Sequence, residues 1–493
     1  EGAFARLCRI ILHIADMETV KRQGMSARII KTMGLFGGVQ GLVLLCGVVR
    51  TKLVALWIGA AGVGLFSIYN SAIDLVVTVA MLGIAASAVR DIAAAPEGMK
   101  NLMARAALRW GWVLGAVGAV AIAAMAPVFS RHSFGDDSHA WAFIALAAAV
   151  MMNSLTSIRS GIMQGLKEYR RMARASMWGT AAGVALSAPL FYFLRVDSIV
   201  PAILIFSAAM LVPTAMAMPR LRSDEPLGWR QTLSLGRGFI ILGVYITLSQ
   251  ATSYCVNYLF ASWLSTTASV DEVGFYQAGF NLFNRYAGLI FAAIGVEYFP
   301  RLSMAADRRR RVEVFVNHES MLILWLILPL TTLFIIAGPL LVRLLYTEAF
   351  LPIVPMISVG IIGVTLRGLS WCIAFTILAR GDGLLYLVSE VSSALVCLGL
   401  NIAGYRLGGL TGLGISYTVW YAVYLAIVAV IYLRRYGLRI NRSVWWLTGA
   451  CLATGSLMAL TEIACPALKP LNWAAAAASV VASGRALRRL WRH

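Results

Sequence analysis

Charged side chains are scarce in this 493-residue sequence. They make up 13% of it, whereas hydrophobic residues make up 60% and the mean hydropathy is +0.79. An average soluble domain carries about 25% charged residues, so the composition indicates a polytopic membrane protein. The alternation of polar and apolar residues that is typical of membrane strands is also missing. We therefore expect the spans to be α-helices, which satisfy their own backbone hydrogen bonds in lipid.

Patterns typical of disulfides and metal sites are missing too. The seven cysteines are scattered without a CxxC spacing, and the five histidines form no ligand cluster. The stretch "GDDSH" at 135–139 brings acids and a histidine together, but it lies in a predicted outer loop, where acids are usually solvated. We expect no metal and no cofactor. The loops are short and leave no room for a soluble catalytic domain, so we do not expect an enzyme.

Long apolar runs predict about fourteen transmembrane helices and an all-α fold. The runs fall at about 30–56, 62–88, 108–128, 140–165, 174–194, 198–218, 236–262, 272–299, 319–342, 351–379, 383–404, 410–433, 443–462 and 470–484. We expect four parts: an N-terminal segment (1–29), a first bundle of six spans with its linker (30–233), a second bundle (234–434), and two further spans with a basic tail (435–493).

Lysine and arginine predict the orientation, because they accumulate on the cytoplasmic side. Thirty-two of the 42 lie in alternate segments beginning with the N-terminal one, and seven lie on the opposite side. Both termini are therefore predicted to be cytoplasmic. The net charge of +20 is mostly this orientation signal, and nucleic acid binding is not expected.

The N-terminal segment allows two interpretations. The stretch "ARLCRIILHIADMETVKR" has apolar residues at helical spacing and basic residues between them, which suits a helix on the inner membrane surface. Alternatively, translation begins at Met25 and the preceding residues are unimportant. A secretory signal is not predicted, because the segment has no apolar core with a small-residue cleavage site.

A weak internal repeat relates the two halves. Residues 64–75 match residues 274–285 at an offset of about 210, with aromatic and amide residues in similar places. In this register Asp74 corresponds to Asn284, next to Arg285. Repeated halves in transporters commonly enclose a substrate site near the middle of the membrane. We therefore expect two matched bundles around a central site.

Three stretches resemble a known family. The run "RTKLVALWIGAAGVGLFSIYNSAIDL" (50–75), with "SIVPAIL" (198–204) and "GGLTGLGISY" (408–417), is similar to Wzx-type O-antigen and polysaccharide flippases. The resemblance implies the multidrug/oligosaccharidyl-lipid/polysaccharide (MOP) exporter superfamily, with two bundles arranged as a V around a cavity. It also implies movement of undecaprenyl-pyrophosphate-linked oligosaccharide from the inner to the outer leaflet of the bacterial inner membrane by alternating access.

The resemblance implies partners and a subfamily as well. The expected partners are membrane lipid and the undecaprenyl-pyrophosphate-linked glycan, with other polysaccharide assembly proteins as further candidates, and the expected state is a monomer. The two extra spans are known from such flippases, including the lipid II flippase. The first span has no dense set of basic residues on its inner part, as the lipid II branch would suggest, which favours the O-antigen type.

Arginines inside spans are the candidates for pyrophosphate binding. A guanidinium stays charged when desolvated and forms bidentate hydrogen bonds with phosphate oxygens, so it suits a polar path through hydrocarbon. The candidates are Arg285, Arg367, Arg159 and Arg50. The alternative is that Arg285 pairs with Asp74, that Arg367 pairs with Glu390 or Glu297, and that Arg159 and Arg50 extend toward the headgroups.

Acids and amides in the same spans complete the predicted site. Asp74 lies in the middle of a span, where a carboxylate costs roughly 2.5–3.5 kcal/mol on insertion scales and needs compensation. We expect Asp74 to face the cavity and pair with Arg285, or else Asp74, Glu297 or Glu390 to carry a coupling cation or proton. Amides that are candidates for sugar contacts, or for helix packing, are Asn70, Asn153, Gln250, Asn257, Asn281 and Asn284.

Two other classes remain as alternatives to a flippase. A cation-coupled multidrug exporter of the MATE kind would have twelve spans and an acidic cavity. A membrane enzyme of polysaccharide synthesis would need a large outer loop or a soluble domain. The predicted count of spans and the excess of intramembrane arginine favour the flippase.

Overall fold

A computed structural model describes residues 41–221, 228–464 and 469–490, and these are helical almost throughout, with no strand among them. The first described helix covers 41–57. The α-helices that follow are α2 (Ala60–Met81), α3 (Ile84–Ala94), α4 (Glu97–Ala124), α5 (Ala126–Phe134), α6 (Ala140–Gly165), α7 (Tyr169–Leu194), α8 (Ile199–Ala217), α9 (Trp229–Thr267), α10 (Val270–Met304), α11 (Arg309–Leu345), α12 (Val354–Ala379), α13 (Gly383–Val430), α14 (Arg442–Ala464) and α15 (Lys469–Leu490).

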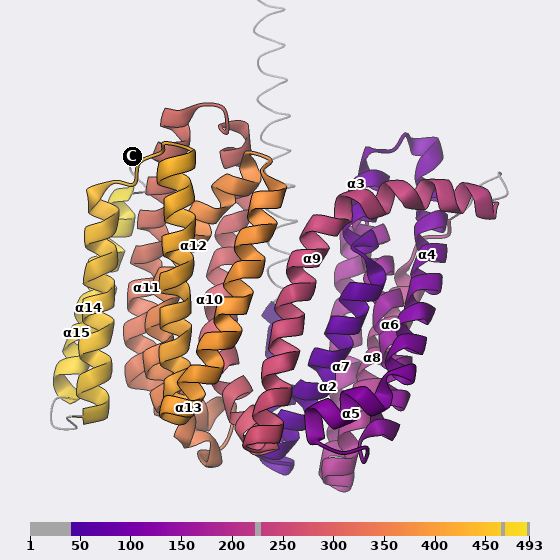
Figure 1. The fold of residues 1–493 in the computed structure, drawn as a ribbon, viewed down its shortest axis with the longest axis horizontal. Coiled ribbons are helices and arrows are strands. Elements are labelled where there is room, and N and C mark those ends of the chain that lie inside the picture. Colours follow the sequence, from indigo (N-terminus) through magenta and orange to yellow (C-terminus); the bar gives the residue numbers. More distant parts are fainter. Residues whose placement is uncertain (1–40, 222–227, 465–468, 491–493) are drawn as a thin grey trace, which may run out of the picture.

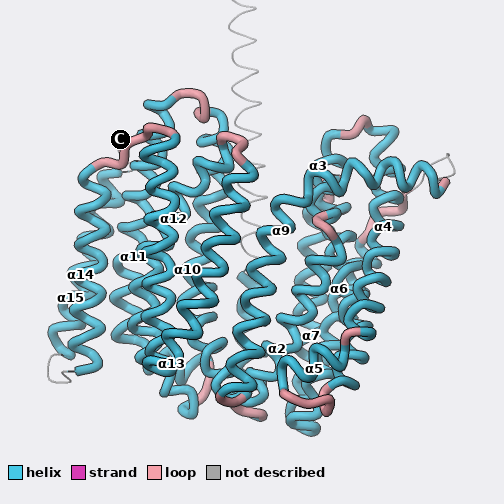
Figure 2. The backbone as a smooth tube through the Cα atoms, viewed as in Figure 1, coloured by secondary structure: helices cyan, strands magenta, loops and turns pink. Residues whose placement is uncertain are grey.

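The helices form two bundles that stand side by side (Figure 1). The N-terminal bundle contains α2 to α8, and the C-terminal bundle contains α10 to α13. Helix α9 first runs across one end of the N-terminal bundle and then turns to pass between the two bundles. Helices α14 and α15 lie against α11 on the outside of the C-terminal bundle. Short loops join the helices (Figure 2).

Eight helical stretches are long and apolar enough to cross a membrane among the described residues. Two of them are hairpins of two spans each. In 169–217, α7 and α8 are separated by the 3₁₀ turn Arg195–Ser198. In α13 the chain reverses at Gly408 and Gly409, and the Ser416 hydroxyl donates to the Leu400 carbonyl at 2.7 Å across the two arms. The all-α membrane fold predicted from hydropathy is confirmed.

The span predicted over 62–88 differs from the structure at its inner end. Helix α2 stops at Met81, because Leu82 and Gly83 adopt left-handed backbone angles (φ 45° and 69°), and α3 begins at Ile84. Glycine takes such angles without steric cost, so this turn is built around Gly83. Likewise the span predicted over 108–128 ends at Ala124, and Pro127 lies in the first turn of α5, where its missing N–H is tolerated.

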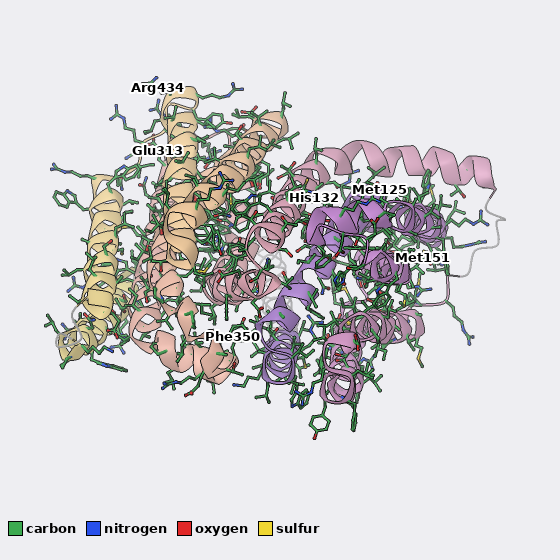
Figure 3. The ribbon with its side chains drawn as sticks, turned by 60° about the horizontal axis from the view of Figure 1, so that its bottom comes forward. Met125, His132, Met151, Glu313, Phe350 and Arg434 are labelled. Atoms are coloured by element: carbon green, nitrogen blue, oxygen red, sulfur yellow. The ribbon has the colours of Figure 1, made fainter. Side chains whose placement is uncertain are left out.

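The arginine-rich turns meet at one end of the C-terminal bundle. The Arg435 guanidinium lies 3.6 Å from Asp382, and the Asn317 amide donates to the Arg439 carbonyl at 3.1 Å. Glu313 and Arg434 lie at this end of the bundle and Phe350 at the other (Figure 3). We name the arginine-rich end inner and the opposite end outer, following the sequence prediction.

Candidate functional site

The two bundles touch at their outer ends through glycines. A Cβ atom added to Gly64 of α2 would lie 2.1 Å from the Val270 carbonyl oxygen, and one added to Gly274 of α10 would lie 2.0 Å from the Ala60 carbonyl oxygen. The backbones of α2 and α10 therefore approach more closely than any side chain permits. Gly64 and Gly274 are also the residues that the repeat aligns, so equivalent helices of the two halves cross here.

Apolar packing and one lysine extend this outer contact. A buried cluster joins Val54 and Val63 of the N-terminal half to Leu282 and Val342 of the C-terminal half. The Lys52 ammonium donates to the carbonyls of Arg343 (2.8 Å) and Leu344 (2.9 Å), and to that of Tyr346, at the end of α11. Cations stabilise helix C-termini by binding carbonyls that have no helical partner. The outer end is closed by these contacts.

Along one face of helix α2, the side chains are buried near the outer end and exposed toward the inner end. Ala60 and Val63 at the outer end are buried, Ser67 one turn further is partly exposed, and Asp74 is exposed. These positions are separated by three, four and seven residues, so they lie in one row on the helix. The Asp74 carboxylate lies within electrostatic range of the Tyr254 hydroxyl on α9.

Helix α9 has a similar row, but here the exposed residues come first in the chain and the buried ones follow. Gln250 and Tyr254 are exposed and Asn257 is partly exposed, whereas Ala261 and Leu264, on the same row, are fully buried near the outer end. Polar side chains in membrane helices face protein or water-filled space rather than lipid tails. Both rows are therefore buried near the outer end and exposed toward the inner end.

Arg367 of α12 is held by neutral groups and aromatic rings. Its Nη1 donates to the Asn284 side-chain oxygen at 2.5 Å and the Asn284 carbonyl at 3.1 Å, and it lies 3.5 Å from the Tyr417 hydroxyl. The guanidinium carbon lies 5.1 Å from the ring centre of Phe291 and 5.8 Å from that of Tyr421. Such cation–π contacts stabilise a charge in an apolar bundle.

The alternative pairing of Arg367 with Glu390 is wrong. Glu390 of α13 accepts a short hydrogen bond from the Tyr424 hydroxyl instead. Among the described residues, Nε and Nη2 of Arg367 make no hydrogen bond, and no carboxylate pairs with the side chain. Arg367 thus keeps donors for a further acceptor.

Arg50 and Arg159 lie apart from Arg367. Arg50 belongs to the N-terminal half, where its guanidinium is sandwiched between Phe66 (4.7 Å) and Phe206 (4.3 Å). Arg159 of α6 is in line with Trp141 and Ala148, eighteen and eleven residues before it, and these are exposed on the outside of the helix. This placement of Arg159 fits a side chain that extends toward the inner headgroups.

Two predicted site residues fall outside what the structure describes. The backbones of Arg285 and Glu297 belong to α10, but their side chains lie outside the described residues. The predicted pair of Asp74 and Arg285 therefore stays a prediction. The predicted surface helix within 1–29 also lies outside the described residues.

The predicted amides have different surroundings. Asn284 binds Arg367, and Asn257 accepts a hydrogen bond from Gln277 at 3.3 Å, which joins α9 to α10. The Asn70 amide donates to the Phe66 carbonyl of its own helix at 2.6 Å. Asn257 thus bridges two helices, Asn70 bonds within its own helix, and Gln250 is exposed.

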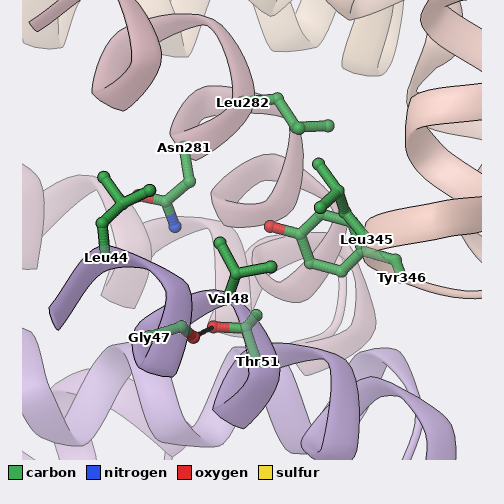
Figure 4. Close-up of a pocket in the computed structure, with 8 residues that line it drawn as sticks. All are labelled: Leu44, Gly47, Val48, Thr51, Asn281, Leu282, Leu345 and Tyr346. Carbon is green, nitrogen blue, oxygen red and sulfur yellow. Dashed lines mark hydrogen bonds between the residues drawn. The ribbon is translucent and has the colours of Figure 1, made fainter. Parts of the chain in front are cut away.

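Asn281 lines a small groove between helix 41–57, α10 and the end of α11 (Figure 4). The groove has a cavity volume of about 40 Å³ and is otherwise mostly apolar. Its lining residues are Leu44, Gly47, Val48, Thr51, Asn281, Leu282, Leu345 and Tyr346. The Tyr346 hydroxyl donates to the Ala278 carbonyl at 3.3 Å, so Asn281 supplies the free polar group of this groove.

Sequence reasoning missed Tyr254, Tyr417 and Phe291. Aromatic residues are common in membrane helices, and nothing in their spacing distinguishes these three from lipid-facing rings. The heptad-like row of Gln250, Tyr254 and Asn257 is the signal that could have found Tyr254. No three His, Cys, Asp or Glu side chains gather as metal ligands within the described part of the chain.

The outer loop after α5 contains a shielded histidine. His139 Nδ1 lies 2.7 Å from the Tyr69 hydroxyl, and the Phe134 ring stacks on the imidazole with ring centres 3.9 Å apart. Burial lowers the pKa of His139, and the nearby Asp136 charge opposes this shift. Hydrogen bonds from Ser138 lower the pKa of the Asp136 carboxyl, and one from Arg131 lowers that of Asp137. Both acids are exposed and bind neighbouring residues.

The sequence matches a family model described as polysaccharide biosynthesis protein over residues 58–355, which is more than half of the chain. None of the curated protein sequences matches it. With the fold, the family match confirms the predicted relation to the MOP superfamily.

Solved structures of MOP transporters share this fold. The lipid II flippase MurJ in an inward closed conformation superposes with a TM-score of 0.70 at 11% identity, covering 93% of this chain and 100% of that one. An inward-facing multidrug resistance MATE transporter superposes with a TM-score of 0.65 at 15% identity, covering 84% of this chain and 96% of that one. A MOP transporter from Pyrococcus furiosus superposes with a TM-score of 0.57 at 15% identity, covering 86% of this chain and 94% of that one. At such identities the likeness establishes the fold.

Proposed function

Because the chain belongs to the polysaccharide biosynthesis protein family, we propose that it is a flippase for undecaprenyl-pyrophosphate-linked oligosaccharide. The cargo is the repeat unit of an O-antigen or related surface polysaccharide, moved from the inner to the outer leaflet of the bacterial cytoplasmic membrane, with both termini cytoplasmic. A diphosphate cannot cross hydrocarbon unaided, since desolvating an unpaired charge costs tens of kcal/mol in the Born limit of about ε 4. A polar path with a fixed cation removes most of this barrier.

Arg367 carries the proposal. It is a permanent cation at membrane depth, it has no carboxylate partner among the described residues, and Nε and Nη2 remain available there. Asn284 and the two rings orient the guanidinium, so little conformational entropy is lost when phosphate oxygens bind. Arg285, one residue after Asn284, is proposed to contribute a second cation.

Transport by this site needs two states. In one state, the headgroup enters a polar hollow beside the exposed rows of α2 and α9 while the prenyl chain stays in lipid. Separation of α2 and α10 at Gly64 and Gly274, with release of Lys52 from α11, opens the outer end. This opening also separates the apolar cluster that joins Val54 and Val63 to Leu282 and Val342.

Substitution of Arg367→Gln tests the function in cells. The variant keeps hydrogen-bonding capacity and removes the charge. Hydrogen bonds to charged groups contribute about 1.5–3 kcal/mol, so transport should fall roughly tenfold to hundredfold and lipid-linked glycan should accumulate in the inner leaflet. Leaflet-resolved quantification of the glycan measures this. Arg406→Gln is the matched control, because Arg406 lies in the exposed outer turn over Trp263. Unchanged transport in Arg367→Gln removes this residue from the site.

The exposed Asp74 supports a cation-coupled multidrug exporter as second candidate. An accessible carboxylate in a hollow is suited to organic cations or a coupling proton. Efflux of a cationic dye by the purified, reconstituted protein, abolished in Asp74→Asn, would favour this candidate. Absence of dye efflux with intact glycan transport would exclude it.

A further inference from the structure

Helix α6 carries a polar strip made of Asn153, Ser157, Ser160 and Gln164. The spacing of four, three and four residues places these side chains in one row over eleven residues, about 16 Å of helix. Ser157 and Gln164 are exposed, and Asn153 and Ser160 are partly exposed. None of the four side chains is hydrogen-bonded to another described residue, although each has donors and acceptors.

The strip continues a row that is buried at its outer end. On its outer half the same row consists of Ala142, Leu146 and Ala149, which are fully buried in the largest apolar cluster, one that includes residues of the C-terminal bundle. The exposed apolar residues of α6, Trp141 and Ile144, lie on another face.

A third face of α6 is occupied by neighbouring helices. A Cβ atom at Gly161 would lie 2.7 Å from the Ala85 carbonyl oxygen of α3, so this face is closely packed. The strip is therefore the inner continuation of an interior row, buried at the outer end and accessible at the inner end. The rows on α2 and α9 are also buried at the outer end, and all three rows are exposed toward the inner end.

The chemistry of the strip excludes most parts of the proposed cargo. It has two amides and two hydroxyls and no charge, so it offers a diphosphate no countercharge. It offers a prenyl chain no apolar surface. Neutral groups that both donate and accept hydrogen bonds match a ligand that is rich in hydroxyls, and the length of the row accommodates more than one sugar ring.

We propose that this strip is the saccharide subsite. It forms hydrogen bonds with the sugar while Arg367 in the other bundle binds the diphosphate. The assignment rests on the proposed function. It divides recognition between the two halves of the molecule. The row Asn153–Gln164 then sets which glycan is accepted, and Arg367 sets the affinity for any prenyl diphosphate.

Binding by the purified full-length protein tests this division. The probes are undecaprenyl diphosphate, which has no sugar, and the lipid-linked oligosaccharide extracted from membranes of the producing cells. The wild-type protein should bind the glycosylated probe at least about tenfold more tightly, since several neutral hydrogen bonds add to the affinity. The double variant Asn153→Leu/Gln164→Leu should bring the ratio of the two dissociation constants close to one, with the affinity for undecaprenyl diphosphate unchanged.

Thr156→Val is the matched control on α6. The Thr156 hydroxyl already donates to the Met152 carbonyl at 2.8 Å and lies off the row, so this variant should keep the wild-type ratio. Ser157→Ala/Ser160→Ala removes the hydroxyls with less change in shape and should lower the ratio if the leucine variant fails to fold. Equal binding of both probes by the wild type, or an unchanged ratio in the strip variants, overturns the saccharide subsite. Arg367→Gln should weaken the binding of both probes equally. If it weakens the binding of neither, the proposed diphosphate site is wrong instead.

Discussion

At the scale of single residues, aromatic rings lie close to two of the arginines. Arg367 lies near the rings of Phe291 and Tyr421, and Arg50 between Phe66 and Phe206. A carboxylate partner would neutralise the charge, whereas a ring stabilises it and leaves its N–H groups available for an anion. Among the described residues, Arg367 can therefore bind a phosphate ligand without first breaking an ion pair.

The sequence predicts Arg367 but not its surroundings. A lone arginine in an apolar run is visible from composition, and its cost in lipid makes it a candidate. The neighbours Asn284 and Tyr417 are 83 and 50 residues away along the chain. Only the packing of α10, α12 and α13 brings them together, and the register of that packing is not encoded in hydropathy.

His139 predicts a dependence of stability on pH. Its pKa is lowered by burial, so the folded protein favours the neutral imidazole. This contribution to stability is present above the unfolded value of about 6.5 and is lost as the pH falls through the lower folded value. The melting temperature of the purified protein should therefore fall between pH 7.5 and pH 5, and it should fall less in His139→Gln.

The exposed His318 of α11 provides the comparison for this measurement. His318→Gln should keep the full wild-type dependence on pH. An equal fall in melting temperature for wild type and His139→Gln would show that Phe134 and Tyr69 do not hold a neutral imidazole.

At the scale of helices, hydropathy predicts spans well and their interruptions poorly. The run 140–165 coincides with α6, because both ends are marked by polar residues and loops. The turn at Leu82 lies inside an apolar run, so no change in hydropathy marks it. The part of α9 that runs across the N-terminal bundle is held by Trp110, whose Nε1 donates to the Thr232 carbonyl at 2.8 Å, a tertiary contact that the local sequence does not reveal.

The crossing of α2 and α10 gives a prediction at this scale. Gly274→Leu places a side chain where the Ala60 carbonyl lies, and overpacking of this kind costs about 1–3 kcal/mol. The outer ends should separate, and a cysteine introduced at the buried Gln277 should become accessible to an impermeant maleimide added outside.

Gly288→Leu on the same helix is the control for this crossing. A Cβ atom at Gly288 meets nothing within 4 Å, so labelling at position 277 should stay as low as in the parent protein. If Gly274→Leu also leaves position 277 unlabelled, the glycine contact does not close the outer end.

At the scale of the whole molecule, the two halves are related in sequence and differ in chemistry. The repeat aligns Gly64 with Gly274, and the structure places these glycines against each other at the outer crossing. The described interior of the N-terminal half presents Asp74 and amide or hydroxyl groups, whereas that of the C-terminal half presents Arg367. A repeat detected in sequence predicts that the halves match, but not which half carries the cation.

Flipping by purified protein in proteoliposomes tests the central claim most directly. A fluorescent prenyl-diphosphate-linked oligosaccharide is incorporated in both leaflets, and an impermeant quencher then reports the fraction that exchanges between them. The account predicts exchange with wild type and with Arg406→Gln, and a loss of roughly tenfold or more with Arg367→Gln. Exchange at the wild-type rate in Arg367→Gln would contradict an interior guanidinium as the carrier of the diphosphate.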